Sequence, residues 1–234
     1  MNRQQKVYSI AIDGPTGAGK STLAKALAAL LGYIYVDTGA LYRAIGYEAL
    51  ATNTDVFSSS EVEKLLQDIS IELEYVDKQQ HVFVNRKDVT GDIRTETVSM
   101  AASAVSAHVA VRAFLLELQR NIAKGSNVIM DGRDIATVVL PNADVKIFLT
   151  ASSEERAGRR YRELIGKGVE ANYEDVLKDL ITRDYNDSHR EIAPLKVAED
   201  AIVFDNTDLE LETAVEQITK LIRERLEVRQ GSID

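Results

Sequence analysis

A short glycine-rich segment constrains this chain more than any other feature. Residues 14–21 read GPTGAGKS and match the pattern G-x-x-x-x-G-K-[ST] at every fixed position. The apolar run Val7–Ile12 before it predicts a buried strand, and the alanine- and leucine-rich stretch after it predicts a helix. A strand, a glycine loop and a helix in this order are the context in which the pattern binds a nucleoside triphosphate. A chance match in a glycine-rich turn, the alternative, does not require these flanks.

The composition of the loop explains how it would hold phosphates. Three glycines let the backbone curl so that successive N–H groups point into one concavity at a helix N-terminus, where peptide dipoles favour anions. Lys20 can reach the β- and γ-phosphates, and the Ser21 hydroxyl can ligate Mg²⁺. We expect ATP to contact these residues: Gly14, Pro15, Thr16, Gly17, Ala18, Gly19, Lys20, Ser21 and Thr22.

The overall composition excludes several classes of protein. The 234 residues are 45% hydrophobic, enough for one core with small insertions, and the net charge of −9 argues against general nucleic-acid binding. The chain has no cysteine, which excludes disulfides and thiolate metal sites. The first residues lack an apolar signal core and no stretch reaches transmembrane length, so we expect a cytoplasmic protein that binds no membrane.

A second predicted strand, Tyr33–Val36, leads into the polar residues Asp37 and Thr38 and then into a helix. Polar groups that follow a strand lie at the carboxyl edge of a sheet, where α/β proteins bind ligands. Arg43 falls early on this helix. It is either a ligand contact or a solvated helix arginine, and its position alone leaves both interpretations open.

The pattern then changes over a stretch that predicts a small appended subdomain. Ser58 and Glu61 have capping-box spacing at the start of a predicted helix. The stretches Ile71–Val76 and Val82–Val84 alternate around a turn at residues 77–80 and predict a β-hairpin. A hairpin and a helix inserted into a run of β–α units are typical of such a subdomain.

Two more helices are predicted, over about residues 96–107 and 109–123. Ser103 lies within the first. Arg112 lies in the first turn of the second, where a cation opposes the helix dipole. This placement favours a ligand for Arg112, and a surface arginine is the alternative.

A third core strand, Asn127–Met130, ends at the sequence Asp-Gly-Arg-Asp. Asp131 after an apolar strand is typical of a Walker B position, whose carboxylate helps to hold Mg²⁺ directly or through water. Such strand-plus-aspartate patterns are common, and the glycine loop upstream gives this one its weight. Arg133 beside Asp134 would add an anion clamp, unless the cluster is a simple Asp-Gly turn with charged flanks.

Arginines dominate the helix that follows the fourth predicted strand. Arg156, Arg159 and Arg160 are spaced i, i+3 and i+4 and share one face, and Gly166 and Gly168 come soon after. An arginine face followed by a glycine pair is typical of a mobile lid that closes on phosphates. A solvated charged helix is the alternative, because glutamates lie nearby.

The next predicted helix ends in the sequence RDYNDSHR at residues 183–190. Its Arg183, Asp187 and Arg190 share a face. They either present donors and an acceptor to a nucleotide or form a ladder of salt bridges. A last strand at Ala201–Phe204 and a charged amphipathic helix over residues 208–227 complete the predicted core.

Four motifs in fixed order carry a resemblance to a known family: GPTGAGKST at 14–22, DTGALYR at 37–43, DGRD at 131–134 and RDYNDSHR at 183–190. Over nearly its whole length the chain resembles the bacterial cytidylate kinases, which are P-loop nucleoside monophosphate kinases. The resemblance implies an α/β P-loop NTPase fold in three layers, with a parallel sheet core, an inserted monophosphate-binding subdomain containing a small antiparallel β element, and a short helical lid. One domain would span residues 1–234, with the core at 1–38, 108–152 and 171–234, the insertion at 39–107 and the lid at 153–170.

The resemblance also implies a reaction and a role for each matched residue. ATP would phosphorylate CMP, and dCMP as well, in a monomeric enzyme that uses Mg²⁺ and binds no nucleic acid. Metal contacts would come from Ser21 and Asp131, and the transferring group would be stabilised by Lys20, Arg133, Arg156 and Arg160. The implied CMP contacts are Asp37 and Thr38; Arg43, Arg133 and Arg190 on the phosphate; Ser103, Arg112 and Asp134 on the base; and Arg183 and Asp187 on the sugar.

Three other functions compete with this interpretation. The acceptor could be UMP, dTMP or shikimate on the same fold, and the base-contacting set is the feature that discriminates. A GTPase switch is a different class, but the guanine motif N-K-x-D is absent from the sequence. A nucleotide-binding protein without catalysis is disfavoured because Lys20 and Ser21 are both present.

Overall fold

Strand β1 (Ser9–Asp13) positions the glycine-rich loop, because the loop begins directly at the carboxyl end of this strand. The computed structural model describes residues 7–76 and 79–231. Two parts of the predictions lie outside these residues: positions 77 and 78 of the hairpin turn, and the two ends of the single domain expected over 1–234. The chain divides into two units. The first runs to Tyr33 and resumes at Asn127, and the second is Ile34–Ser126.

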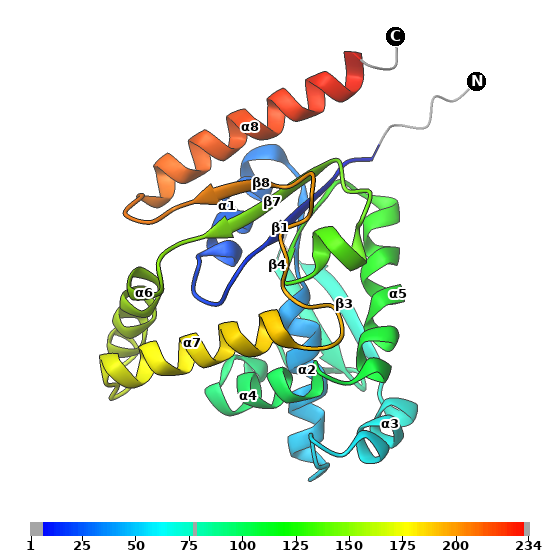
Figure 1. Ribbon diagram of the computed structural model, residues 1–234. Coiled ribbons are helices and arrows are strands. Elements are labelled where there is room, and N and C mark those ends of the chain that lie inside the picture. The colour runs from blue at the N-terminus through cyan, green and yellow to red at the C-terminus, as the bar shows by residue number, and fades with distance from the viewer. Residues whose placement is uncertain (1–6, 77–78, 232–234) are drawn as a thin grey trace, which may run out of the picture. The chain divides into compact units, whose positions relative to one another are not determined.

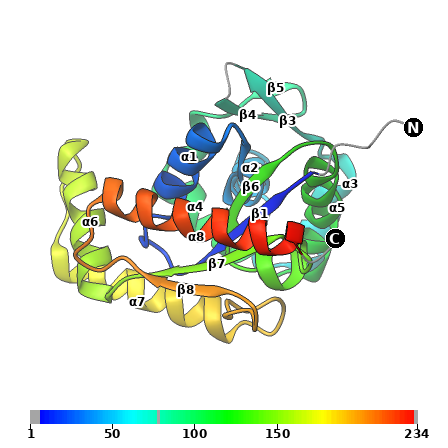
Figure 2. The same ribbon diagram turned by 90° about the horizontal axis from the view of Figure 1, so that it is seen from above.

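The first unit contains a parallel sheet with the strand order β6-β1-β7-β8; Figure 1 labels β1, β7 and β8, and Figure 2 also labels β6. Its elements in chain order are β1, α1 (Lys20–Leu31), β6 (Val128–Gly132), the π-helical turn η2 (Ile135–Val139), β7 (Val145–Thr150), α6 (Ser153–Gly166), α7 (Tyr173–His189), β8 (Ile202–Asp205) and α8 (Leu211–Gly231). Helix α8 packs on α1 and β7, as Figure 2 shows from above. The predicted parallel sheet flanked by helices is confirmed.

The strand register positions the functional loops of this unit. Asp13 pairs with Gly132 of β6 and with Phe148 of β7, so the three strands end at one edge. Parallel strands present their carboxyl ends together, and ligands of α/β proteins bind there. The buried centre of β1, from Ile10 to Ile12, is fully enclosed and anchors this edge on the core.

The second unit combines helices with a small antiparallel sheet of order β3-β4-β5, which confirms the predicted antiparallel element. Its elements are β2 (Ile34–Asp37), α2 (Thr38–Ala51), α3 (Ser59–Asp68), β3 (Ile71–Val76), β4 (Gln79–Val84), β5 (Lys87–Asp88), the 3₁₀ turn η1 (Asp92–Arg94), α4 (Glu96–Val105) and α5 (Val109–Gly125). Leu41 and Ile45 of α2, Val62 of α3, Val82 of β4 and Leu115 of α5 lie in one apolar core.

Helices α2 and α4 of the second unit pack closely on each other. A Cβ on Gly46 would lie 2.8 Å from the backbone nitrogen of Ala102, so only a glycine lets the two helices approach this closely. Within the described ranges, no single helix is long and apolar enough to cross a membrane. The bent pair α4 and α5, with an angle of 102°, meets that criterion only jointly and only by length and composition.

Three local predictions were wrong in detail. Strand β4 begins at Gln79, within the stretch predicted as a turn, rather than at Val82. The first strand begins at Ser9 rather than Val7, which is exposed. Ser58 does precede α3, but its side chain makes no capping hydrogen bond, and Glu61 instead accepts a hydrogen bond from the backbone of Asp55 at 2.9 Å. The loop before the helix therefore uses the glutamate that the capping-box pattern assigned to the helix start.

Candidate active site

The glycine loop is shaped by close contact with the neighbouring strand. A Cβ on Gly14 would lie 2.0 Å from the carbonyl oxygen of Leu149, so no other residue fits there. Gly17 and Gly19 have φ values of 75° and 86°, in the left-handed region that glycine adopts without strain. The loop therefore curls as the sequence pattern predicts, and α1 begins directly at Lys20.

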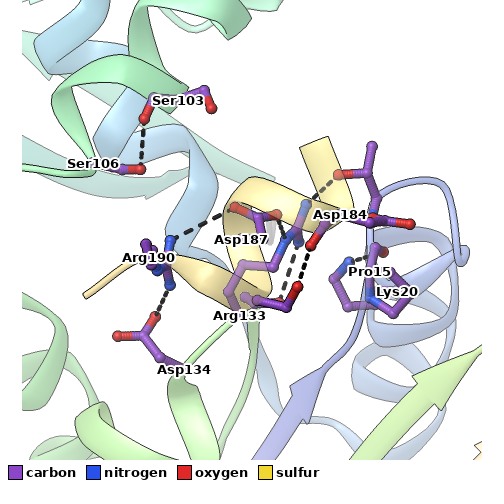
Figure 3. Close-up of polar contacts among 12 residues, drawn as sticks. Pro15, Lys20, Ser103, Ser106, Arg133, Asp134, Asp184, Asp187 and Arg190 are labelled. Carbon is purple, nitrogen blue, oxygen red and sulfur yellow. Dashed lines mark hydrogen bonds and ion pairs between the residues drawn. The ribbon is translucent and has the colours of Figure 1, made fainter. Parts of the chain in front are cut away.

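Lys20 is buried beneath this loop, with 6% of its surface exposed. Its Nζ donates a hydrogen bond to the carbonyl oxygen of Pro15 at 2.7 Å (Figure 3). Burial, together with the nearby guanidinium of Arg133, lowers the pKa of Lys20 to about 7. The charges of Asp131, Asp187 and Asp13 oppose this lowering but do not outweigh it.

Ser21 and Asp131 lie together, as the Walker A and Walker B patterns predict. The Ser21 hydroxyl donates to Oδ2 of the buried Asp131 at 2.7 Å. Mg²⁺ in phosphoryl-transfer sites takes few ligands from protein and completes its shell with phosphate oxygens and water. One hydroxyl and one carboxylate fit that requirement. The described residues contain no cluster of three or more histidine, cysteine or acidic side chains that would suit a metal held by protein alone.

Arg133 links the loop to helix α7. Its Nη2 donates to the Thr16 hydroxyl at 2.8 Å, and its Nε donates to Oδ2 of Asp187 at 2.7 Å (Figure 3). Burial opposes the charge on Asp187, but Arg133 and then Arg190 outweigh it and lower the pKa of this carboxyl. Arg133 and Asp187, which the sequence places in separate motifs, are thus one ion pair.

Arg190 lies between two carboxylates at the end of α7. Its guanidinium is 3.8 Å from Oδ1 of Asp134 and 3.7 Å from Oδ1 of Asp187, and its Nε donates to the carbonyl oxygen of Ala193 at 2.7 Å. Asp134 itself is buried. Arg183, one turn before Asp187 on the same helix, is half-buried. Arg190, Asp134 and Asp187 thus lie together at the end of α7.

The arginines of α6 differ from one another. Arg156 is buried, and it donates to the carbonyl oxygens of Thr16 and Ala151 and pairs with Asp184 of α7. Arg160 pairs with Glu163 one turn later at 2.9 Å and is more exposed. Arg156 therefore contradicts the alternative prediction of a solvated charged helix, because its side chain connects α6 to α7 and to the glycine loop.

In the second unit, Asp37 holds two arginines at the start of α2. Its Oδ2 accepts from Arg43 Nη2 at 2.7 Å and from Arg94 Nη1 at 2.8 Å, while its Oδ1 caps the helix by accepting from the backbone of Ala40. Burial opposes the charge, but the two guanidiniums lower the pKa of Asp37. Thr38, directly after it, is buried. Among the described atoms, Arg43 Nε is buried without a hydrogen-bond partner.

Ser103 and Arg112 lie on consecutive helices of the second unit. Ser103 is exposed on α4, and its carbonyl oxygen accepts from the Ser106 hydroxyl at 2.8 Å (Figure 3). Arg112 is 9% exposed, donates from Nε to the carbonyl oxygen of Ser106 at 2.7 Å, and lies over the ring of Tyr42. These contacts explain locally how a cation is tolerated in the first turn of α5.

Comparison with known proteins decides the family. The family model for cytidylate kinase matches residues 10–224. The chain belongs to the cytidylate kinase family. It is 50% identical to a cytidylate kinase of Caldicellulosiruptor bescii over 216 residues, which cover 92% of this chain and 96% of the relative. It is 49% identical to one of Ligilactobacillus salivarius over 220 residues, which cover 94% and 98%.

A solved structure is similar in fold alone. An uncharacterised protein of Eubacterium ventriosum matches with a TM-score of 0.51 at 12% identity, over 92% of this chain and 98% of that one. This likeness agrees with the parallel-sheet architecture of the cytidylate kinase family member and adds nothing about its chemistry.

Four polar residues of this cytidylate kinase family member were missed by sequence reasoning. Asp184 accepts from the backbone of Thr16, and Asn206 donates to the carbonyl oxygen of Ala18, so both support the loop. The others are Asp13, described below, and Arg94. Asp184 could have been found, since it lies within the RDYNDSHR motif, but no pattern singles out the rest.

Proposed function

We propose that this member of the cytidylate kinase family transfers the γ-phosphoryl group of ATP to CMP, giving ADP and CDP, and that dCMP is a second acceptor. The observation that carries the proposal is the family match over residues 10–224, which spans all four motifs. We further propose that the enzyme acts as a cytoplasmic monomer that binds neither nucleic acid nor membrane, with the insertion at 39–107 and the lid at 153–170.

ATP binds through the amides of the glycine loop, with its phosphates at the N-terminus of α1. Lys20 exchanges its bond to Pro15 for the β- and γ-phosphates and keeps its proton there, because the phosphates favour the charged amine. Thr22 and Ser21 are both exposed at the start of α1, where they can face the nucleotide. The loop thus positions the donor and neutralises its charge.

Mg²⁺ would be held by Ser21 and Asp131, where it supplies positive charge on the phosphate oxygens. The hydroxyl and carboxylate oxygens, 2.7 Å apart, are donors of the type this ion prefers. The protein needs no covalent intermediate, because direct in-line transfer requires mainly positioning and charge neutralisation. The acceptor is already a phosphate oxygen anion, so a strong general base is not needed.

The acceptor phosphate is assigned to Arg43, Arg133 and Arg190. Each of them pairs with a carboxylate in the structure, Arg43 with Asp37 and the other two with Asp187. These carboxylates hold the guanidiniums in place, and a guanidinium is a donor whose planar geometry suits bidentate binding of phosphate oxygens. Arg156 and Arg160 of the lid are assigned to the transferring group.

The base and sugar of CMP are assigned to the other residues of the family motifs. The carboxylate of Asp134 accepts from the cytosine 4-amino group, while Arg112 donates to ring acceptors and Ser103 adds a hydroxyl. Uracil has a carbonyl in place of that amine and would meet Asp134 acceptor to acceptor, which disfavours UMP. Arg183 and Asp187 are assigned to the sugar, and Asp37 and Thr38 support the phosphate contact.

The test is a coupled assay of ADP release with ATP and each of CMP, dCMP, UMP, dTMP and shikimate. We expect CMP and dCMP to give the highest kcat/KM. A clear preference for UMP would overturn the assignment of the base contacts. Slow hydrolysis of GTP with no transfer to any acceptor would overturn the kinase function as a whole.

A further inference from the structure

Asp13 is a buried carboxylate for which the proposed reaction has no use so far. It is the last residue of β1, directly before Gly14, and 1% of its surface is exposed. Its Oδ1 accepts from the backbone nitrogen of Ile135 at 2.9 Å, and its Oδ2 accepts from that of Ala136 at 2.7 Å. Both oxygens thus bind consecutive N–H groups at the start of η2.

The two backbone N–H groups that Asp13 binds come directly after Arg133 and Asp134, the two residues proposed to contact CMP. Strand β6 ends at Gly132, Arg133 and Asp134 follow, and η2 begins at Ile135. The turn closes on Asp134, whose carbonyl oxygen accepts from Val138 at 2.8 Å. Gly132 is also the register partner of Asp13. The segment is therefore fixed on one side by the sheet and on the other by this carboxylate, with Arg133 and Asp134 between the two.

A carboxylate is a costly way to stabilise a turn at this depth. Burial and the charge of Asp134 together raise the pKa of Asp13 to about 6, against the opposing effects of the two backbone hydrogen bonds and of Lys20. Buried charges are tolerated only where they are well hydrogen-bonded. Side chains whose pKa is strongly shifted by burial are concentrated at functional sites. The position of Asp13, between the glycine loop and the DGRD motif, agrees with such a role.

We infer that Asp13 is a positioning residue, whose hydrogen bonds to Ile135 and Ala136 fix the directions of the Arg133 and Asp134 side chains and so set the affinity and base specificity for the acceptor nucleotide. The inference rests on the proposed function. It adds a residue that touches neither substrate but acts through two that do.

The first test is Asp13→Asn in the full-length protein. An amide has one acceptor oxygen where the carboxylate has two, so one of the two N–H groups loses its partner. We expect calorimetry without ATP to give a Kd for CMP about tenfold higher, because Arg133 and Asp134 are no longer held in their binding directions by the second-layer contact. The CMP/UMP ratio of kcat/KM falls, and the KM for ATP changes by less than about twofold.

The matched control is Asp144→Asn. Asp144 accepts from the backbone of Ser9 at 2.9 Å, at the opposite end of the same strand. The amide of this variant keeps one acceptor oxygen for Ser9, so we expect at most a small change in melting temperature and an unchanged CMP/UMP ratio. A double variant adds a second criterion: if Asp13 acts through Asp134, Asp13→Asn causes no further loss of base selectivity once Asp134→Ala is present.

The inference fails if folded Asp13→Asn keeps the parental Kd for CMP and CMP/UMP ratio, or if its KM for ATP rises as much as that for CMP. Should Asp13→Asn not fold, Asp13→Glu keeps both acceptor oxygens on a longer stem and is expected to lower the same ratio. If neither variant folds, the role is structural and the inference is wrong. Absence of CMP phosphorylation by the parent protein would instead reject the proposed function.

Discussion

Arg94 donates to the same oxygen of Asp37 that Arg43 contacts, and the two distances are 2.8 Å and 2.7 Å. One buried carboxylate thus orders two guanidiniums at the start of α2. Arg94 lies in η1, more than one-third exposed, whereas Arg43 is mostly covered. The backbone of Ala40 binds the other oxygen, so the carboxylate that positions Arg43 has fixed contacts at both of its oxygens.

We expect Arg94→Ala to weaken acceptor binding more than donor binding. Loss of one cation from Asp37 lets the carboxylate reorient Arg43, so the KM for CMP should rise about three- to tenfold with little change in the KM for ATP. Steady-state kinetics with each substrate varied in turn measure this. Arg120→Ala, at an exposed position of α5, is the control. A larger rise in the KM for ATP would contradict the assignment.

Lys20→Met should strongly lower turnover without unfolding the protein. The amine is proposed to neutralise charge during transfer, and loss of one such contact lowers kcat by about a hundredfold or more. Because burial lowers the pKa of Lys20 to about 7, an apolar replacement removes an unfavourable buried cation, and the melting temperature should not fall. Lys25→Met, exposed on the same helix, should keep parental kcat. Equal turnover in Lys20→Met and the parent would reject the role.

Arg190→Ala should raise the KM for CMP more than the KM for ATP. The guanidinium lies against Asp134 and Asp187, both proposed to contact the acceptor, so its loss leaves two carboxylates without their shared cation. Dead-end inhibition by an unreactive ATP analogue would give an independent measure of donor affinity. The reverse order of effects would assign Arg190 to the donor.

The raised pKa of Asp13 leads to a prediction about how the free energy of unfolding depends on pH. Its pKa is raised from 3.8 to about 6 in the fold, so the native state binds more protons between these values. Its contribution to stability is therefore present below about pH 3.8 and is lost as the pH rises through about 6. Each pH unit between the two values is worth about 1.4 kcal/mol. The difference in unfolding free energy between the parent and Asp13→Asn should fall by about 2–3 kcal/mol from pH 4 to pH 7, measured by urea denaturation. A difference that grows with pH would contradict the burial argument.

Gly46→Ala should destabilise the second unit. The added Cβ would lie 2.8 Å from Ala102 N and 3.2 Å from the Ala101 side chain, which forces α2 and α4 apart. We expect a loss of about 1–3 kcal/mol, as for other overpacked sites. Gly91→Ala is the control, because nothing lies within 4 Å of its Cβ and its φ of −77° suits alanine. It should be neutral or stabilising by about 0.4–1 kcal/mol, and equal effects of the two changes would contradict the packing argument.

The sequence predicts well what depends on short-range pattern. The glycine loop, the helix that begins at Lys20, the hairpin strands and the contact of Ser21 with Asp131 all follow from motifs with a known structural context. The Ser58 capping box failed because its glutamate found a donor in the preceding loop at Asp55, a choice that the spacing alone does not determine.

What the sequence could not predict depends on register and on packing between distant segments. Asp13 reaches η2 only because β1 and β6 pair with Asp13 beside Gly132. Arg156 reaches Asp184 only because α6 packs on α7. Such partners are separated by many residues, and neither hydrophobic period nor charge spacing specifies them. The roles assigned to these side chains toward CMP and ATP remain predictions.

The guanidinium of Arg156 has a consequence for the order of motions in a catalytic cycle. It donates to the carbonyl oxygen of Thr16 at 2.9 Å and to that of Ala151 at 2.9 Å, so the first turn of α6 is bound to the glycine loop and to the segment that follows β7. Bending of the proposed lid must therefore begin beyond Arg156. The rate of ADP release would then depend on movement of the distal turns of α6. The glycine loop would keep the same conformation throughout the catalytic cycle.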